Sequence, residues 1–286
     1  MRKTDKKIFG LKERLNRIKK FILNVWEIMW RPEMAVLPGQ LAFFVILSLV
    51  PIITLIGYGA SFFDISVGTI IKVIEANFGA DITQLILPII GGKSIDLNLL
   101  LMLGLMFYVA SNGADSIIVA SNQIYNIKQS SWIKRRIKAL FLTIMIVILV
   151  LFVLLVPAFG SKIIDTVDYF NMKSTLANIL EIMQGPISWL IMFVFIKIIY
   201  TISPDRAQPS SRVNLGAIFT TAGWIIATAI YSNYIKNFAE YKLFYAGLSN
   251  IAILMLWIYF LSFIFVIGMS LNSKFELEEL EITGTI

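Results

Sequence analysis

The sequence of 286 residues contains no cysteine and no histidine. Without cysteine there can be no disulfide, no thiolate-held iron–sulfur cluster and no thiol nucleophile. Without histidine there is no imidazole metal site, no Ser–His triad and no histidine proton relay. The sequence also contains neither a P-loop nor a dinucleotide-binding fingerprint. These absences exclude or disfavour most of the chemistry of soluble enzymes, and we expect neither a metal nor another cofactor.

Charged residues are scarce as well. They make up 15% of the chain, whereas hydrophobic residues make up 58%. Because about a quarter of the residues in a soluble domain are charged, this composition predicts an all-α integral membrane protein with one membrane domain over residues 1–286. The net charge of +7 is concentrated near one end of the chain. That pattern is typical of topology signals and contacts to anionic lipid, so the expected partners are membrane lipids and not nucleic acid. The oligomeric state stays open.

Residues 1–30 combine positive charge with a helical pattern of apolar side chains. Nine of the first twenty residues are Lys or Arg, and apolar residues recur every three or four positions from Ile8 to Met29. This spacing predicts an amphipathic helix. No short apolar run with a small-residue cleavage site follows, so we do not expect a cleavable signal peptide. The helix either lies on the anionic cytoplasmic leaflet or packs beneath the bundle, and both placements are cytoplasmic.

Six stretches of the chain are long and apolar enough to form transmembrane helices. Each has the ~20 residues that a helix needs to cross ~30 Å of hydrocarbon. Small residues such as Gly216 and Gly223 predict that the fifth of these helices approaches a neighbour closely. The predicted spans are about 35–59, 97–121, 138–160, 182–202, 213–235 and 247–270.

The stretch between the first two spans, residues 60–96, predicts a shorter amphipathic segment. Apolar residues recur at helical spacing from Val67 to Phe78, and another apolar run ends at Gly91. Neither run is long enough to cross a bilayer. We therefore expect a helical segment in the outer interface, with a re-entrant piece as the alternative.

Basic residues set the predicted orientation. They gather in the N-terminal segment and in the loop after the second span. Because loops rich in Lys and Arg stay in the cytoplasm, both termini are predicted to be cytoplasmic. Residues 271–286 are predicted to form an acidic cytoplasmic tail. The basic residues of the loop are Lys128, Lys134, Arg135, Arg136 and Lys138.

The second span carries the strongest candidate for a functional site. Asp115 is the only carboxylate deep inside an apolar run. At helical spacing it lies on a mostly polar side of the helix, which is a poor surface to present to lipid. We therefore expect this side to face protein or water. It contains Tyr108, Asn112 or Ser111, Asp115, Val119 and Asn122.

Asp115 has a candidate partner in Lys197 of the fourth span. Asp115 lies about six residues from the cytoplasmic end of its span, and Lys197 lies about five residues from the end of a span that runs the same way. At ~1.5 Å per residue the two have similar depths, so we predict that they form an ion pair. Functionally, they would line a cytoplasm-facing cavity with Asp115 as a protonatable gate. Structurally, they would be a static pair, or Lys197 would extend to the interface while Asp115 binds Asn112 and Ser111.

The first span adds three further candidates. Pro51 removes one backbone hydrogen bond and clashes with the carbonyl of Leu47, so it predicts a kink that is either a hinge or a static bend. Ser48 is placed to bind part of the freed backbone. Gln40 and Ser48 could line the same cavity as Asn112 and Asn122, although packing between helices explains such polar residues equally well.

Several blocks of the sequence resemble the motifs of one known family. They are QLAFF through LSLVP at 40–51, NQIY at 122–125 before basic residues, Tyr200 with SPD at 203–205, YAGL at 245–248, LWIY at 256–259, and Gly268 with LN at 271–272. In this order they resemble the YihY/BrkB family of multi-pass bacterial inner-membrane proteins, from about residue 20 to residue 274. One position departs from the pattern, because Ser270 stands where the family usually has an acidic residue.

The resemblance implies a transporter or translocase of an amphipathic envelope molecule, such as a lipid or a lipid-linked precursor. The alternative is a non-transporting membrane scaffold for envelope assembly. The family has also carried a tRNA-processing ribonuclease label, which we reject for this chain. Metal-dependent RNA hydrolysis needs clustered ligands in an aqueous site, and here the only deep carboxylate, Asp115, stands alone. We therefore do not expect an enzyme.

Overall fold

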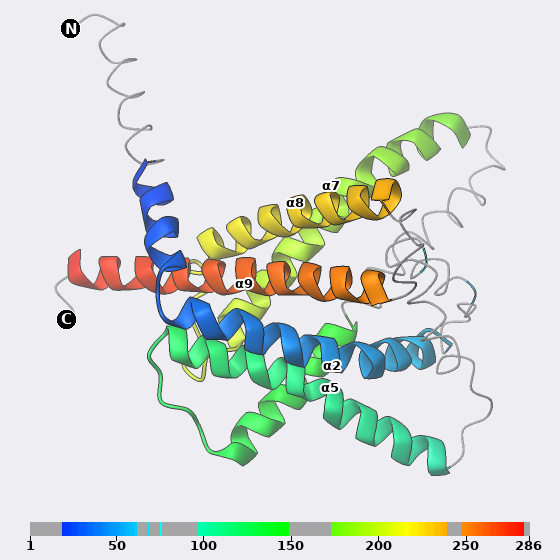
Figure 1. Cartoon of the computed structure of the whole chain (residues 1–286), viewed down its shortest axis with the longest axis horizontal. Helices are drawn as coiled ribbons and strands as arrows, with labels where there is room; N and C mark the ends of the chain where they lie inside the picture. The colour runs from blue at the N-terminus through cyan, green and yellow to red at the C-terminus, as the bar shows by residue number, and fades with distance from the viewer. Residues whose placement is uncertain are drawn as a thin grey trace, which may run out of the picture.

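The computed structural model describes residues 19–61, 68, 75, 97–148, 173–238 and 248–282. Within these ranges the chain forms helices and short connections, and no strand occurs (Figure 1). The predicted all-α architecture is therefore confirmed for the part of the chain that the structure describes. The segment predicted at the outer interface lies almost entirely outside these ranges.

Five long helices make up most of the structure. Two further helical segments cover residues 19–29 and 132–148. Three apolar stretches among the described residues, 185–202, 214–234 and 251–277, are long enough to cross a membrane, while the apolar stretch Glu33–Ser48 is shorter. The long helices are α2 (Glu33–Ser61), α5 (Leu97–Ile124), α7 (Lys173–Ile202), α8 (Asn214–Phe238) and α9 (Leu248–Ile282).

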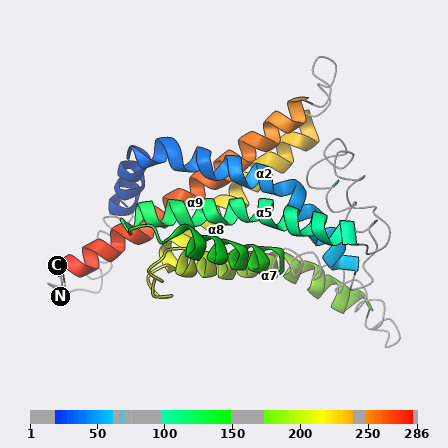
Figure 2. The same cartoon turned by 90° about the horizontal axis from the view of Figure 1, so that it is seen from below.

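Helix α9 organises the packing. α2 packs along α5, and α7 packs along α8, while α9 contacts α2, α5 and α8 (Figures 1 and 2). The main core forms around α9, where Phe265, Val266 and Met269 are buried with Tyr200 of α7 and Leu41 of α2. This apolar contact holds the two helix pairs on either side of one central helix.

The contact between α8 and α9 depends on two glycines. A Cβ atom at Gly216 would collide with the backbone oxygen of Gly268, and one at Gly268 would collide with the side chain of Thr220. The absence of both side chains lets the buried amide of Asn272 accept a hydrogen bond from the Gly216 backbone N–H at 2.7 Å. The predicted close approach of this helix is confirmed.

Helix α2 continues past Pro51 and ends at Ser61. The Pro51 side chain lies outside the described residues, so the predicted kink stays a prediction. Ser48 does not bind the carbonyl of Leu47. Its hydroxyl donates to the carbonyl of Phe44 at 2.7 Å and accepts from the backbone N–H of Gly113 at 3.2 Å. Ser48 is therefore a buried contact between α2 and α5.

The helix at residues 19–29 lies across α9 rather than along it (Figure 1). One face packs on the core, with Ile28 buried and Phe21 against Phe219 of α8. A second face is apolar and exposed, and Trp30, just beyond the helix, extends it with 73% of its surface accessible. The described part of this segment packs against the bundle and presents an apolar face outward, while its predicted placement on the cytoplasmic leaflet stays a prediction. The exposed apolar residues are Ile22, Leu23, Trp26, Met29 and Trp30.

One end of the bundle collects most of the described basic residues, and we call it the basic end. α5, α7 and α9 end there, and α2 and α8 begin there (Figure 1). The predicted acidic tail is not a separate segment within the described residues, since α9 continues through it to Ile282. Glu276 of this extension is buried, with an exposed fraction of 8%.

Candidate functional site

A pair of reciprocal hydrogen bonds joins Asn122, near the end of α5, to Asp205, in the turn between α7 and α8. The Asn122 amide donates to the Asp205 carboxylate at 2.8 Å, and the Asp205 backbone N–H donates to Asn122 Oδ1 at 2.8 Å. Asn122 is fully buried. Two motif blocks that are separated by about eighty residues in the sequence therefore meet in one contact.

The Asp205 carboxylate also holds the segment that follows α5. It accepts a hydrogen bond from the backbone N–H of Ser130 at 2.9 Å and one from the Lys138 ammonium at 3.2 Å. Lys138 also donates to the carbonyl of Pro204 at 2.7 Å. Burial alone would raise the pKa of Asp205, but the donors of Ser130, Asn122 and Lys138 together lower the pKa below its usual value of 3.8. Asp205 is therefore an ionised anchor for three chain segments.

Asp115 pairs with Arg135 and not with Lys197, so the predicted ion pair between Asp115 and Lys197 is wrong. The Arg135 Nε–H donates to Asp115 Oδ1 at 2.8 Å. The chain reverses after α5, and this reversal brings the beginning of the helix at 132–148 back against the Asp115 side of α5. A similar distance from the ends of two helices is therefore not enough to bring two side chains into contact.

Arg136 occupies the neighbouring part of the same face. Its guanidinium donates to Asn112 Oδ1 at 2.8 Å and to the carbonyl of Tyr108 at 2.6 Å. It also lies 3.6 Å from the centre of the Tyr108 ring, which adds a cation–π contact. The polar side of α5 thus faces protein groups, as its sequence pattern predicts, and two arginines cover much of it. We call this set the α5 network: Asn112, Asp115, Asn122, Arg135, Arg136, Lys138 and Asp205.

The other predicted site residues lie apart from this network. The Ser111 hydroxyl is buried and donates to the carbonyl of Tyr108 at 2.6 Å within α5. Ser48 is committed to Phe44 and Gly113, and Gln40 is half-buried on α2. None of the three is joined to Asp115 by a hydrogen bond among the described residues.

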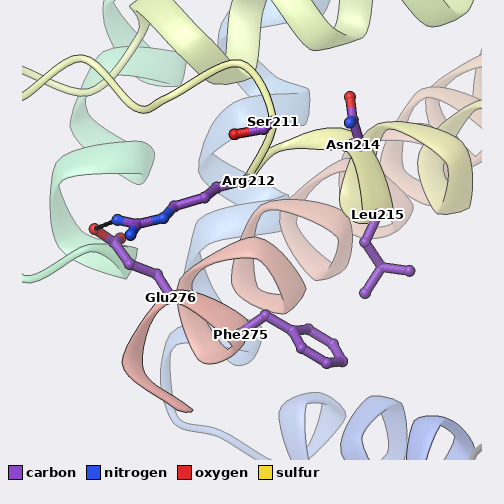
Figure 3. Close-up of a pocket in the computed structure, with 6 residues that line it drawn as sticks. All are labelled: Ser211, Arg212, Asn214, Leu215, Phe275 and Glu276. Atoms are coloured by element: carbon purple, nitrogen blue, oxygen red, sulfur yellow. Dashed lines mark ion pairs between the residues drawn. The ribbon is translucent and has the colours of Figure 1, made fainter. Parts of the chain in front are cut away.

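A second polar cluster at the basic end was not predicted from the sequence. Glu276 of α9 pairs with Arg206 at 3.0 Å and with Arg212 at 3.7 Å. Beside it is a pocket of about 460 Å³, where Leu215 and Phe275 supply the apolar wall (Figure 3). The buried Tyr125 hydroxyl lies near Glu276, and burial together with this charge raises the pKa of Tyr125 well above its usual value. The cluster ties the end of α9 to the turn before α8.

Lys197 lies in a groove of about 340 Å³ on α7. The groove is mostly apolar, with hydroxyl groups only at Thr201 and Ser210. Among the described residues, Lys197 has neither an ion pair nor a hydrogen bond from its side chain. The residues that line it are Phe193, Val194, Lys197, Ile198, Thr201, Ile202 and Ser210.

The described residues contain no group of three His, Cys, Asp or Glu side chains that could hold a metal ion. The acidic side chains discussed above are instead held by Lys or Arg. An arrangement of apolar helices with ion pairs and amide contacts at one end defines an α-helical membrane protein.

The chain belongs to the BrkB family, because the family model described as Virulence factor BrkB matches residues 25–284. The predicted family is therefore confirmed. No solved structure matches the chain.

Three curated relatives show how widely the similarity extends. The chain is 28% identical over 240 residues to YfkH of Bacillus subtilis, which is named a ribonuclease-like protein. The aligned region covers 82% of this chain and 87% of that protein. It is 23% identical over 271 residues to a UPF0761 membrane protein of Tolumonas auensis, covering 88% and 84% of the two chains. A UPF0761 membrane protein of Idiomarina loihiensis is 25% identical over 126 residues, covering 43% and 44%.

Proposed function

We propose that this protein translocates an amphipathic envelope molecule, such as a lipid or a lipid-linked precursor, across the bacterial cytoplasmic membrane. The chain would cross the membrane six times, with the basic end and both termini in the cytoplasm. The excess of Lys and Arg at the basic end supports this orientation. The helix at 19–29 supports it too, because its exposed apolar face suits the boundary between headgroups and acyl chains.

The observation that carries the proposal is the incomplete burial of the Asp115–Arg135 ion pair in the α5 network. Asp115 and Arg135 keep 24% and 23% of their side-chain surface exposed, although Asp115 lies within a predicted span. A rigid support gains little from such a pair, because apolar packing of similar volume is often as stabilising or more so. Ionisable groups at membrane depth commonly mark the path of a polar group.

In this proposal, the contacts of the α5 network close the path at the basic end. Arg135 and Arg136 belong to the segment that follows α5, and both bind back onto α5. Opening the path requires this segment to leave α5. Hydrogen bonds to charged groups contribute about 1.5–3 kcal/mol each, and a few kcal/mol is the size of difference that a ligand can overcome in a two-state protein.

A lipid-movement assay in vesicles tests the proposal. The full chain is reconstituted with a fluorescent phosphatidylglycerol, and the fraction accessible to an external quencher is followed with and without a proton gradient. We expect the wild type to move the probe faster than protein-free vesicles, and Asp115→Asn to change the rate at least about threefold, as expected when ~0.7 kcal/mol is added to or removed from the barrier. The matched control is Glu33→Gln, an exposed acidic residue at the start of α2, which should leave the rate unchanged. Equal rates with and without wild-type protein would contradict translocation.

A membrane scaffold is the second candidate, and a different observation favours it. Asn112, Asp115 and Asn122 all have protein partners. A scaffold would use these contacts to fix the helices at the basic end. In that case Asp115→Asn would alter stability, and the wild type would not move the probe.

A further inference from the structure

Lys197 is an intramembrane cation without an acidic partner among the described residues. It lies five residues before the end of α7, within the apolar stretch 185–202. At about 1.5 Å per residue it is roughly 7–8 Å below that end of the helix. Ionisable side chains at this depth are rare and are normally paired, so the missing partner needs an explanation.

The acidic side chains of the basic end do not provide this partner. Asp115 binds Arg135, Asp205 binds Lys138, and Glu276 binds two arginines. Glu27 is bound by Lys274 at 2.6 Å. None of the acidic side chains that the structure describes, exposed Glu33 included, forms an ion pair with Lys197, so a negative charge from outside the described part of the chain can balance it.

The groove around Lys197 opens on the outside of the bundle. Ile196, Ile199 and Tyr200 form the buried side of α7. At about 100° per residue, Val194 lies opposite this side, with 44% of its surface exposed, and the half-buried Lys197 lies on the flank between the two sides. In a membrane the Val194 side of α7 faces lipid.

The chemistry of the groove changes along its length. Phe193 and Val194 give an apolar wall on the membrane side of Lys197, while Thr201 lies one turn nearer the basic end. Ser210, from the turn between α7 and α8, lines the groove as well. Neither hydroxyl makes a hydrogen bond to another side chain or backbone group that the structure describes. An ammonium beside two free hydroxyls can bind phosphate oxygens, and the apolar wall can hold an acyl chain.

We propose that this groove binds an anionic phospholipid of the leaflet at the basic end. Its phosphate would be bound by Lys197, Thr201 and Ser210, and one acyl chain would lie against Phe193 and Val194. This inference goes beyond the proposed function, because a lipid bound on the outer side of α7 is expected whether the protein translocates a molecule or only supports other proteins.

Native mass spectrometry of the full chain, released from detergent, tests the proposal. The protein is stripped of lipid and titrated with phosphatidylglycerol or phosphatidylethanolamine. We expect one phosphatidylglycerol molecule to bind more tightly than any further lipid molecules that the protein takes up. Lys197→Gln should weaken this binding about tenfold or more, the loss expected for a charge-assisted hydrogen bond. Lys197→Arg should retain it.

The matched control is Lys128→Gln, which removes the same charge from an exposed loop at the basic end and should leave the tight binding unchanged. Equal weakening by both substitutions would show general attraction to a basic surface and would overturn the site. Unchanged binding in Lys197→Gln would overturn it too.

Two further measurements keep the test decisive if Lys197→Gln does not fold. Thr201→Val preserves shape and removes one hydroxyl, and we expect about threefold weaker binding; no change would contradict the proposed phosphate contact. Glycerol phosphate, the soluble headgroup, should compete only weakly because it lacks the acyl chain. Competition equal to that of the whole lipid would contradict the acyl contact and assign the groove to free phosphate.

Discussion

Replacing Asp205 by alanine should loosen the turn between α7 and α8 from the end of α5. The substitution removes the acceptor for three donors, those of Asn122, Ser130 and Lys138. Hydrogen bonds to charged groups contribute about 1.5–3 kcal/mol each, but they are not additive here, because the buried Asn122 amide keeps its contact with Gln129. We expect the free energy of unfolding to fall by about 2–4 kcal/mol.

A double-mutant cycle isolates the side-chain hydrogen bond between the two motif blocks. Asn122→Ala and Asp205→Ala are made singly and together, and unfolding in mixed micelles is followed by circular dichroism. The coupling energy should be about 1–3 kcal/mol, as for residues that share a hydrogen-bond network. The control cycle uses Glu27 and Lys274, whose pair is largely exposed at Glu27, and it should give a smaller coupling energy, as expected for a surface ion pair. Additive effects at Asn122 and Asp205 would refute the role assigned to their contact.

The pH dependence gives an independent check on Asp205. Its pKa in the folded protein is lowered below the usual 3.8. A carboxyl group with a lowered folded pKa stabilises the protein above its unfolded pKa, and this contribution is lost as the pH falls through the folded value. The difference in free energy of unfolding between wild type and Asp205→Asn should therefore have its full size at neutral pH and become smaller below about pH 4. A difference that is constant down to acidic pH would mean that ionised Asp205 contributes nothing.

Three other substitutions test the packing, the α5 network and the membrane contact. Gly216→Ala should destabilise the protein by about 3 kcal/mol because the new methyl group meets α9. The control Gly39→Ala, which has open space around it, should stabilise α2 by up to about 1 kcal/mol. Equal melting temperatures for the two variants would contradict the close contact between α8 and α9. Arg135→Gln should cost about 1–2 kcal/mol in micelle unfolding, while exposed Lys134→Gln stays within about 0.5 kcal/mol. Trp30→Phe should reduce the share of tryptophan emission quenched by lipids brominated near the headgroup, and an unchanged share would place Trp30 outside the bilayer.

The polar side of α5 could be predicted from its sequence, but its partners could not. The spacing of Asn112, Asp115 and Asn122 is enough to show that one side of the helix avoids lipid. In the sequence, Arg135 and Arg136 fit the pattern of topology signals, and such a role requires no partner. Only the reversal of the chain after α5 shows that the same arginines fold back onto the helix.

The end of α9 could not be predicted for a related reason. Four glutamates after a long apolar span are typical of a solvated tail, and residues 271–286 were interpreted in that way. The buried position of Glu276 depends on Arg206 and Arg212, which are more than sixty residues earlier in the chain. The sequence does contain a weak indication that the helix continues past residue 270, because Leu271 and Phe275 extend the apolar face of α9 by one further turn.

The central position of α9 has a consequence for biosynthesis. It is the last of the described helices to leave the ribosome, yet it contacts α2, α5 and α8, and its Phe265 carbonyl accepts a hydrogen bond from the Tyr200 hydroxyl of α7. The pairs α2–α5 and α7–α8 must therefore enter the membrane before their shared partner exists. Until α9 arrives, the hydrogen bonds of Asp205 with Asn122, Ser130 and Lys138 are available to join the two pairs. Stable assembly of the bundle should thus follow synthesis of the whole chain rather than accompany it helix by helix.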